Sequence, residues 1–187
     1  GSSLALAAIR TLEGTPEAEF DAAGIGIQAS TLELPLDNPL YIAGSGLGLL
    51  RRGHSSWLRL RTEIAALSIG PLSFLCLPGE VYPEIVYGGI TAPEGRDFPA
   101  GPVETPALYR EMPGRCRFVI GLANDEIGYI IPRSEWDDEA PNLYGRKTSP
   151  YGEINSLGPE TGPLVHRKAL ELIRRLAGTP RPGPLSE

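Results

Sequence analysis

Histidine and cysteine are scarce in this chain, and the usual signatures of metal and nucleophile sites are missing with them. The only such residues are His54, His166, Cys76 and Cys116. No CxxC pair occurs, which excludes a thiolate zinc site, and neither HExxH nor GxSxG occurs. His166 is expected on the solvated side of the last helix, and both cysteines are expected to be buried thiols.

Long apolar runs and basic blocks are also missing. No stretch approaches the ~20 apolar residues that a membrane-spanning helix needs, so no transmembrane segment is expected. The formal charge is −6 and Arg51-Arg52 is only a pair, not part of a basic block, which argues against nucleic acid as a partner. With 41% hydrophobic and 21% charged residues, the chain has the composition of a folded globular domain.

Alternation of apolar and polar residues predicts strands in the first half of the chain. Residues 24–34 form one strand, with an irregularity expected near Ala29. Residues 58–66 form a half-buried strand, and a turn at 69–71 leads into a returning strand at 72–77. This pair predicts a β-hairpin that ends at Pro78-Gly79-Glu80.

The second half combines two strands with one well-marked helix. Residues 117–122 and 127–131 read as strands, and an apolar stripe from Leu164 to Leu176 predicts a closing helix. Residues 88–115 are rich in proline and glycine, which indicates a long loop or an insertion. We therefore expect residues 1–187 to form a single compact α+β domain, with a mixed β-sheet and flanking helices.

Two residues at strand ends are candidates for chemistry. Glu80 follows an apolar strand through a Pro-Gly turn, which suits a carboxylate at a sheet edge. The same position suits an acidic residue before a helix at 82–87, favoured by the helix dipole. Tyr129 lies in a β segment, where a tyrosine is usually a core residue with its hydroxyl satisfied. The residue pattern alone leaves both readings open for each position.

The order and spacing of several short motifs resemble the neutral/alkaline (non-lysosomal) ceramidases and their bacterial relatives. The first motif is the strand that ends in PGE at Glu80, and the second is G-L-x-N at 121–124, with Tyr129 five positions after Asn124. LELPLDNPL near the start and GPETGPLVHRKALELI near the end are also similar. The resemblance covers about residues 24–176 and corresponds to the C-terminal half of the catalytic domain.

The resemblance implies a zinc-dependent amidase that hydrolyses the N-acyl bond of a ceramide-like lipid. Glu80 and Tyr129 would be zinc ligands, and Tyr129 would also be catalytic. Two further ligands would be histidines from an earlier half that is not recognisable here, so the chain would hold part of the site. An upstream domain or self-association is then expected, and a secreted or periplasmic location is what the resemblance suggests.

Two other functions stay open at this point. One is a non-catalytic ceramidase-like domain that serves as a binding or assembly module without a complete metal site. The other is a metal-free hydrolase that uses the carboxylates Glu80, Asp125 and Glu126 as acid and base, since paired carboxylates do this chemistry when their pKa values differ.

Overall fold

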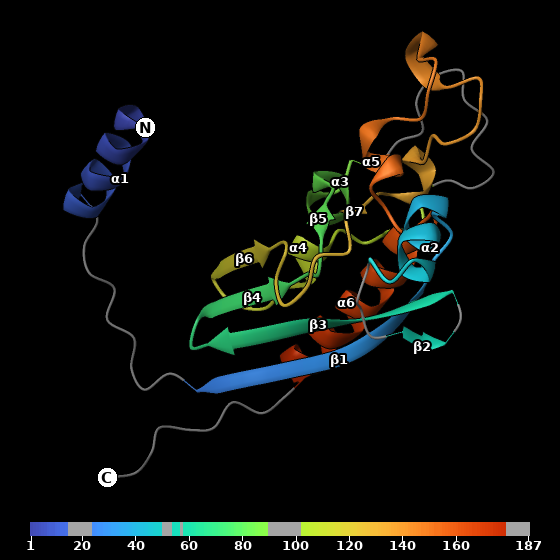
Figure 1. Cartoon of the computed structure of the whole chain (residues 1–187). Coiled ribbons are helices and arrows are strands. Elements are labelled where there is room, and N and C mark those ends of the chain that lie inside the picture. Colours follow the sequence, from blue (N-terminus) through green and yellow to red (C-terminus); the bar gives the residue numbers. More distant parts are fainter. Residues whose placement is uncertain (15–23, 50–53, 57, 90–101, 179–187) are drawn as a thin grey trace.

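The main sheet has four strands in the order β1-β3-β4-β6, and the short β2 pairs with the start of β3 (Figure 1). The computed structural model describes residues 1–14, 24–49, 54–56, 58–89 and 102–178. β1–β3 and β3–β4 are antiparallel and β4–β6 is parallel, so the expected mixed α+β architecture is confirmed. The strands are β1 (Ile25–Pro35), β2 (His54–Ser56), β3 (Arg59–Ile69), β4 (Leu72–Cys76) and β6 (Cys116–Ile120).

The register between β1 and β3 is continuous from Ile25↔Ile69 to Pro35↔Arg59. The irregularity predicted near Ala29 is therefore wrong. In the first part of β1 the large apolar residues occupy odd-numbered positions, and in the last part they occupy even-numbered positions, so the two groups lie on opposite faces of the sheet. Ile25 and Ile27 lie on the open side of the sheet, whereas Leu34 is completely buried on the other side.

The closing helix α6 (Thr161–Gly178) covers one face of the sheet and packs mainly on β1 and β3. Its apolar stripe, which includes Val165, Ala169 and Leu172, is fully buried. These side chains form one cluster with Ile64 and Leu75 of the sheet. Each large aliphatic side chain buried there contributes roughly 1.5–3 kcal/mol, and this cluster is the core of the protein.

The remaining helices are short, except for α1 at the N-terminal end. One turn, α4, lies within the range predicted as a long loop, of which residues 90–101 are outside the described residues. No helix in the described ranges is long and apolar enough to cross a membrane. The helices are α1 (Ser2–Gly14), α2 (Pro39–Gly46), α3 (Pro83–Tyr87), α4 (Leu108–Glu111) and α5 (Tyr151–Ile154), with 3₁₀ turns at Arg133–Glu135 and Leu143–Gly145.

A second sheet of two short strands lies beside the first. β5 (Glu80–Val81) pairs in parallel with β7 (Tyr129–Ile130). In the sequence, β5 follows β4 and β7 follows β6. The ends of β4 and β6 stay paired as the chain leaves the main sheet, since Leu77 N donates a hydrogen bond to Ile120 O. The two strand pairs are thus consecutive, and the small sheet inherits its parallel direction from β4 and β6.

Three predictions about side chains need correction or lie outside the description. His166 is 3% exposed, and its Nε2 lies 2.9 Å from Pro106 O, so it is buried because the 105–107 segment covers it. Both cysteines are free thiols. Cys116 is exposed and Cys76 is half-buried, because their strands place them on the side of the sheet that α6 does not cover. The side chain of His54 is outside the described residues.

Candidate functional site

Glu80 and Tyr129 are direct register partners in the β5–β7 pair, although 49 positions (129 − 80) separate them in the sequence. Partners in a parallel pair project from the same face of the sheet, and here the Glu80 carboxylate helps to raise the pKa of the Tyr129 hydroxyl. Glu80 is exposed and Tyr129 is half-buried. The structure therefore places the two sequence-predicted site residues side by side at an accessible edge.

Backbone contacts hold the two strands in this register. Glu80 N donates to Gly128 O at 3.0 Å, and Tyr82 N donates to Ile130 O at 3.1 Å. A Cβ at Gly79 would collide with Gly128 O, and a Cβ at Gly128 would collide with Asn155 O. Each site residue is thus preceded by a glycine because the backbones approach more closely than a side chain permits.

The alternative readings of both residues are not what the structure shows. Glu80 lies in β5, and the acidic residue in the first turn of α3 is Glu84 instead. Glu80 is therefore not a helix N-terminal acid. Tyr129 is only half-buried, and the carboxylate of Glu80 is one cause of the raised pKa of its hydroxyl.

Two further tyrosines hold the ring of Tyr129 by edge-to-face contacts. The ring centroid of Tyr82 lies 6.3 Å away and that of Tyr151 lies 5.9 Å away, at interplanar angles of 86° and 78°. Such pairs contribute about 0.5–1.5 kcal/mol beyond burial. Sequence reasoning missed both, although Tyr82 lies two positions after Glu80 and shares its side of the extended segment. No sequence signal pointed to Tyr151.

The electrostatic setting of Tyr129 favours its neutral form. Its pKa is raised, first by loss of hydration, then by the hydrogen bond to the Glu80 carboxylate and the charge of that group. The pKa of Tyr82 is also raised, first by burial and then by the charge of Glu153. Both phenols are therefore hydrogen-bond donors at neutral pH.

The loop that leads into β7 is fixed by carboxylates. Asp125 Oδ2 accepts a hydrogen bond from Thr62 Oγ1 at 2.8 Å, and Asp125 Oδ1 accepts one from Glu126 N at 2.8 Å. Glu126 Oε1 accepts one from Gly128 N at 3.0 Å. Asp125 and Glu126, which the metal-free hypothesis uses as acid and base, thus bind the turn that positions Tyr129.

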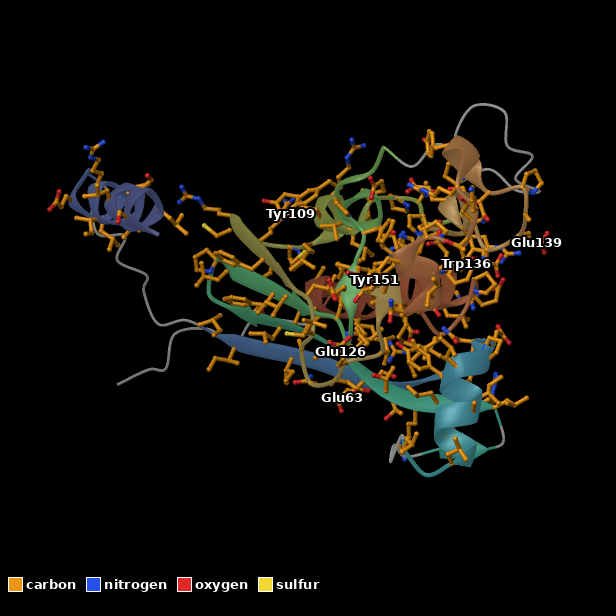
Figure 2. All side chains as sticks on the ribbon, turned by 45° about the horizontal axis from the view of Figure 1, so that its top comes forward. Glu63, Tyr109, Glu126, Trp136, Glu139 and Tyr151 are labelled. Carbon is orange, nitrogen blue, oxygen red and sulfur yellow. The ribbon has the colours of Figure 1, made fainter. Side chains whose placement is uncertain are left out.

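A cleft of about 330 Å³ adjoins the backbone of this site. Ser156 lines the cleft, and its hydroxyl donates to Tyr129 O at 2.7 Å. Figure 2 shows Trp136, another lining residue, at the end of the molecule far from α1. The cleft is lined by Asp37, Asn38, Pro39, Leu40, Trp136, Asp138, Ser149, Glu153, Ile154, Ser156, Gly158 and Pro159.

Buried carboxylates are concentrated near this cleft. Glu153 is 7% exposed; burial raises its pKa, while hydrogen bonds from backbone amides, including Asp137 N at 3.2 Å, oppose the shift. Burial also raises the pKa of Glu135 to about 7, and the charges of Glu84 and Glu104 add to the shift. This part of the protein is therefore polar inside and negatively charged.

The oxygen donors of Glu80 and Tyr129 suit a zinc ion, since carboxylate oxygen is an ordinary zinc ligand and phenolic oxygen a rarer one. Structural and catalytic zinc sites have three or four protein ligands. Within the described ranges, no group of three or more histidine, cysteine, aspartate and glutamate side chains is placed to hold a metal. The pair by itself therefore supplies fewer donors than a zinc site requires.

Comparison of the chain with protein-family models, with curated proteins and with solved structures found no match. The geometry of the site therefore carries the functional argument.

Proposed function

We propose that this chain contributes Glu80 and Tyr129 to the zinc site of an amidase resembling the neutral/alkaline ceramidases. The observation that carries the proposal is the β5–β7 register, which makes these two residues neighbours on one face of the small sheet. The remaining ligands come from outside the described residues. A lipid amide is the substrate that the resemblance suggests.

The residues of the chain have separable roles in this proposal. Glu80 offers a carboxylate at an exposed strand position, and Tyr129 offers a hydroxyl whose direction is fixed by Tyr82 and Tyr151. A bound zinc ion would supply polarisation of the amide carbonyl and activation of water. Tyr129 keeps its proton at neutral pH because its pKa is raised. Its hydroxyl is therefore able to donate a hydrogen bond to an amide oxygen as negative charge develops there.

Zinc binding to the chain tests the proposal directly. Calorimetric titration with zinc should show binding to the wild-type chain and an affinity at least about tenfold lower for the Glu80→Gln, Tyr129→Phe double variant. Thermal denaturation with and without zinc should show a rise in Tm for the wild type alone, because a ligand of the native state stabilises it.

A matched control separates site loss from a general loss of charge and hydroxyl groups. Glu139→Gln with Tyr144→Phe changes the same residue types at exposed positions outside the β5–β7 pair. This variant should bind zinc as the wild type does. If zinc binds equally to all three proteins, Glu80 and Tyr129 are not zinc ligands in this chain, and the non-catalytic binding module becomes the better hypothesis. If zinc binds to none of them, the chain supplies at most half of a zinc site, and the missing ligands have to come from another segment.

A further inference from the structure

One face of the main sheet is apolar across all four strands and has no cover in the described structure. Its twelve residues form three rows that follow the strand registers. None of the twelve carries a charge or a side-chain amide, hydroxyl or carboxyl group. The first row is Ile25, Ile69, Leu72 and Cys116; the second is Ile27, Leu67, Phe74 and Phe118; the third is Ala29, Ala65, Cys76 and Ile120. We call these residues the open face.

Most residues of the open face are exposed or half-buried, and Ala65, at 6% exposed, is the exception. Ile25 is 70% exposed, Ile27 is 65% exposed and Phe118 is 47% exposed. Phe118 stacks on Phe74 with ring centroids 5.1 Å apart, which makes a flat aromatic centre. The opposite face of the same strands is covered by α6. Contiguous apolar patches of this kind mark interaction surfaces in folded proteins.

The helix α1 is a second apolar surface without cover. None of its residues is buried, and Leu4 and Leu12 are 77% and 78% exposed. Leu4, Ala8 and Leu12 recur at intervals of four, so they lie on one side of the helix, and Arg10 lies on the opposite side. A helix of 13 residues is marginal in water unless its apolar side is packed.

We propose that the chain forms a dimer in which α1 of each copy lies across the open face of the other copy. In the structure of a single chain, α1 stands apart from the sheet and both surfaces are bare (Figure 1). A second copy supplies the complement of each. The exchange is reciprocal, so one twofold axis covers all four surfaces, which is the usual symmetry of a homodimer.

The dimensions agree with this arrangement. At 1.5 Å per residue, α1 is about 20 Å long, and four strands at about 4.8 Å spacing span roughly 14 Å. The ten residues between Gly14 and Ile25 reach at most about 35 Å when extended, and they join the open face at its corner residue.

The native thiols of the open face allow a direct test by cross-linking. Cys116 is exposed on this face, and Ala8→Cys places a thiol at the centre of the apolar side of α1. A short bis-maleimide should join Ala8→Cys chains into covalent dimers, with peptide mapping placing the link between position 8 and Cys116 or Cys76. Arg10→Cys, on the opposite side of α1, should give at least about fivefold less of this product.

Light scattering of the full chain over a range of concentrations provides the second measurement. The wild type should be dimeric, and Leu4→Asp with Leu12→Asp should weaken dimerisation at least tenfold. Circular dichroism should show that the sheet remains folded, since both positions are exposed in the single chain. The matched control Ser3→Asp with Arg10→Gln makes the same change in net charge on the opposite side of α1 and should remain dimeric.

Each contrary outcome overturns the exchange in a recognisable way. A link between position 8 and Cys116 that leaves the chain at monomer mass shows that α1 covers its own sheet. A dimer that survives both aspartates shows that the open faces meet each other without α1. A wild-type monomer at all concentrations with no link at position 8 shows that neither surface is used by this chain.

Discussion

The main sheet with α6 and the region around Glu80 and Tyr129 differ in what fills their interiors. The first, which we call the sheet half, buries Leu34, Ile64 and Leu172 completely. The second, the site half, consists of β5, β7 and residues 132–160, and it buries Asp137, Glu153 and Ser156 to within 7% exposure.

This difference determines how each half is stabilised. Apolar burial in the sheet half is non-directional and large, whereas the site half depends on buried polar groups, each of which requires its own partner. Hydrogen bonds from side chains to backbone, such as Ser156 Oγ to Tyr129 O at 2.7 Å, are therefore needed there in addition to the apolar contacts of Ile130 and Leu157. The candidate functional groups lie in the half whose geometry is set by directional bonds.

The largest predicted effect comes from truncation of the apolar core. Ile64→Ala should lower the free energy of unfolding by about 3 kcal/mol, because Ile64 is completely buried between the sheet and α6. Ile27→Ala is the matched control on the neighbouring strand, where the side chain is 65% exposed. Urea denaturation at concentrations where the chain is monomeric should show a much smaller loss for it. Equal losses would mean that the open face is packed within the single chain.

Removing one polar side chain at the junction of the halves should have the next largest effect. Asn38 is 8% exposed; its Nδ2 donates to Ile154 O and Ser156 O, both at 2.8 Å, and its Oδ1 accepts from Leu40 N at 2.9 Å. Asn38→Ala loses these bonds and the cap of α2, so we expect a loss of about 2 kcal/mol.

The control for this variant is Asn155→Ala. Asn155 makes one exposed side-chain bond, to Tyr151 O at 2.8 Å, and its loss should cost about 0.5 kcal/mol. Hydrogen exchange should show that Asn38→Ala exposes the amides of residues 154–157 first. If both variants unfold with the same free energy, side-chain bonds are not what holds the site half.

The smallest predicted effect depends on pH. Because the pKa of Glu135 in the folded chain, about 7, lies above its ordinary value of 4.5, the folded state binds a proton more tightly than the unfolded state does. The free energy of unfolding therefore falls as pH rises from about 4.5 to about 7. Glu135→Gln removes this titration, so the variant should be more stable than the wild type by about 1 kcal/mol above pH 7, after allowance for solvent screening.

Below pH 4.5 the two proteins should have equal stability, since Glu135 is then protonated in both states. Glu139→Gln, four positions later in the sequence at an exposed site, is the matched control. Urea denaturation at pH 4 and pH 8 provides the measurement. A constant difference between Glu135→Gln and wild type at both pH values would show that Glu135 does not change its charge in this range.

Much of the sheet half could be predicted from the sequence because its strands and its helix are long and patterned. The alternation in β3 and the four-residue spacing in α6 each repeat several times, so single exceptions do not hide them. Whether the face of the sheet opposite α6 is covered could not be predicted. Cys76 and Cys116 lie in or beside apolar runs, which favours burial. Only the position of α6 shows that they are on the uncovered side of the sheet.

The geometry around Glu80 and Tyr129 could not be predicted from the sequence. Short motifs make these two residues candidates, but β5 and β7 contain two residues each, and strands of that length have no detectable period. Their pairing is a long-range contact between distant segments. His166 shows the same limit, because its burial depends on Pro106, sixty positions earlier in the chain.

Gly79 and Gly128 bear on how other sequences should be read. Any side chain at Gly79 would press against Gly128 O, and any at Gly128 would press against Asn155 O. A homologous chain that retained Glu80 and Tyr129 but replaced either glycine would hold its two donors further apart. The pairs Gly-Glu and Gly-Tyr, rather than the two donors alone, are therefore the pattern to search for when asking which relatives retain the arrangement and which have drifted to another use of the fold.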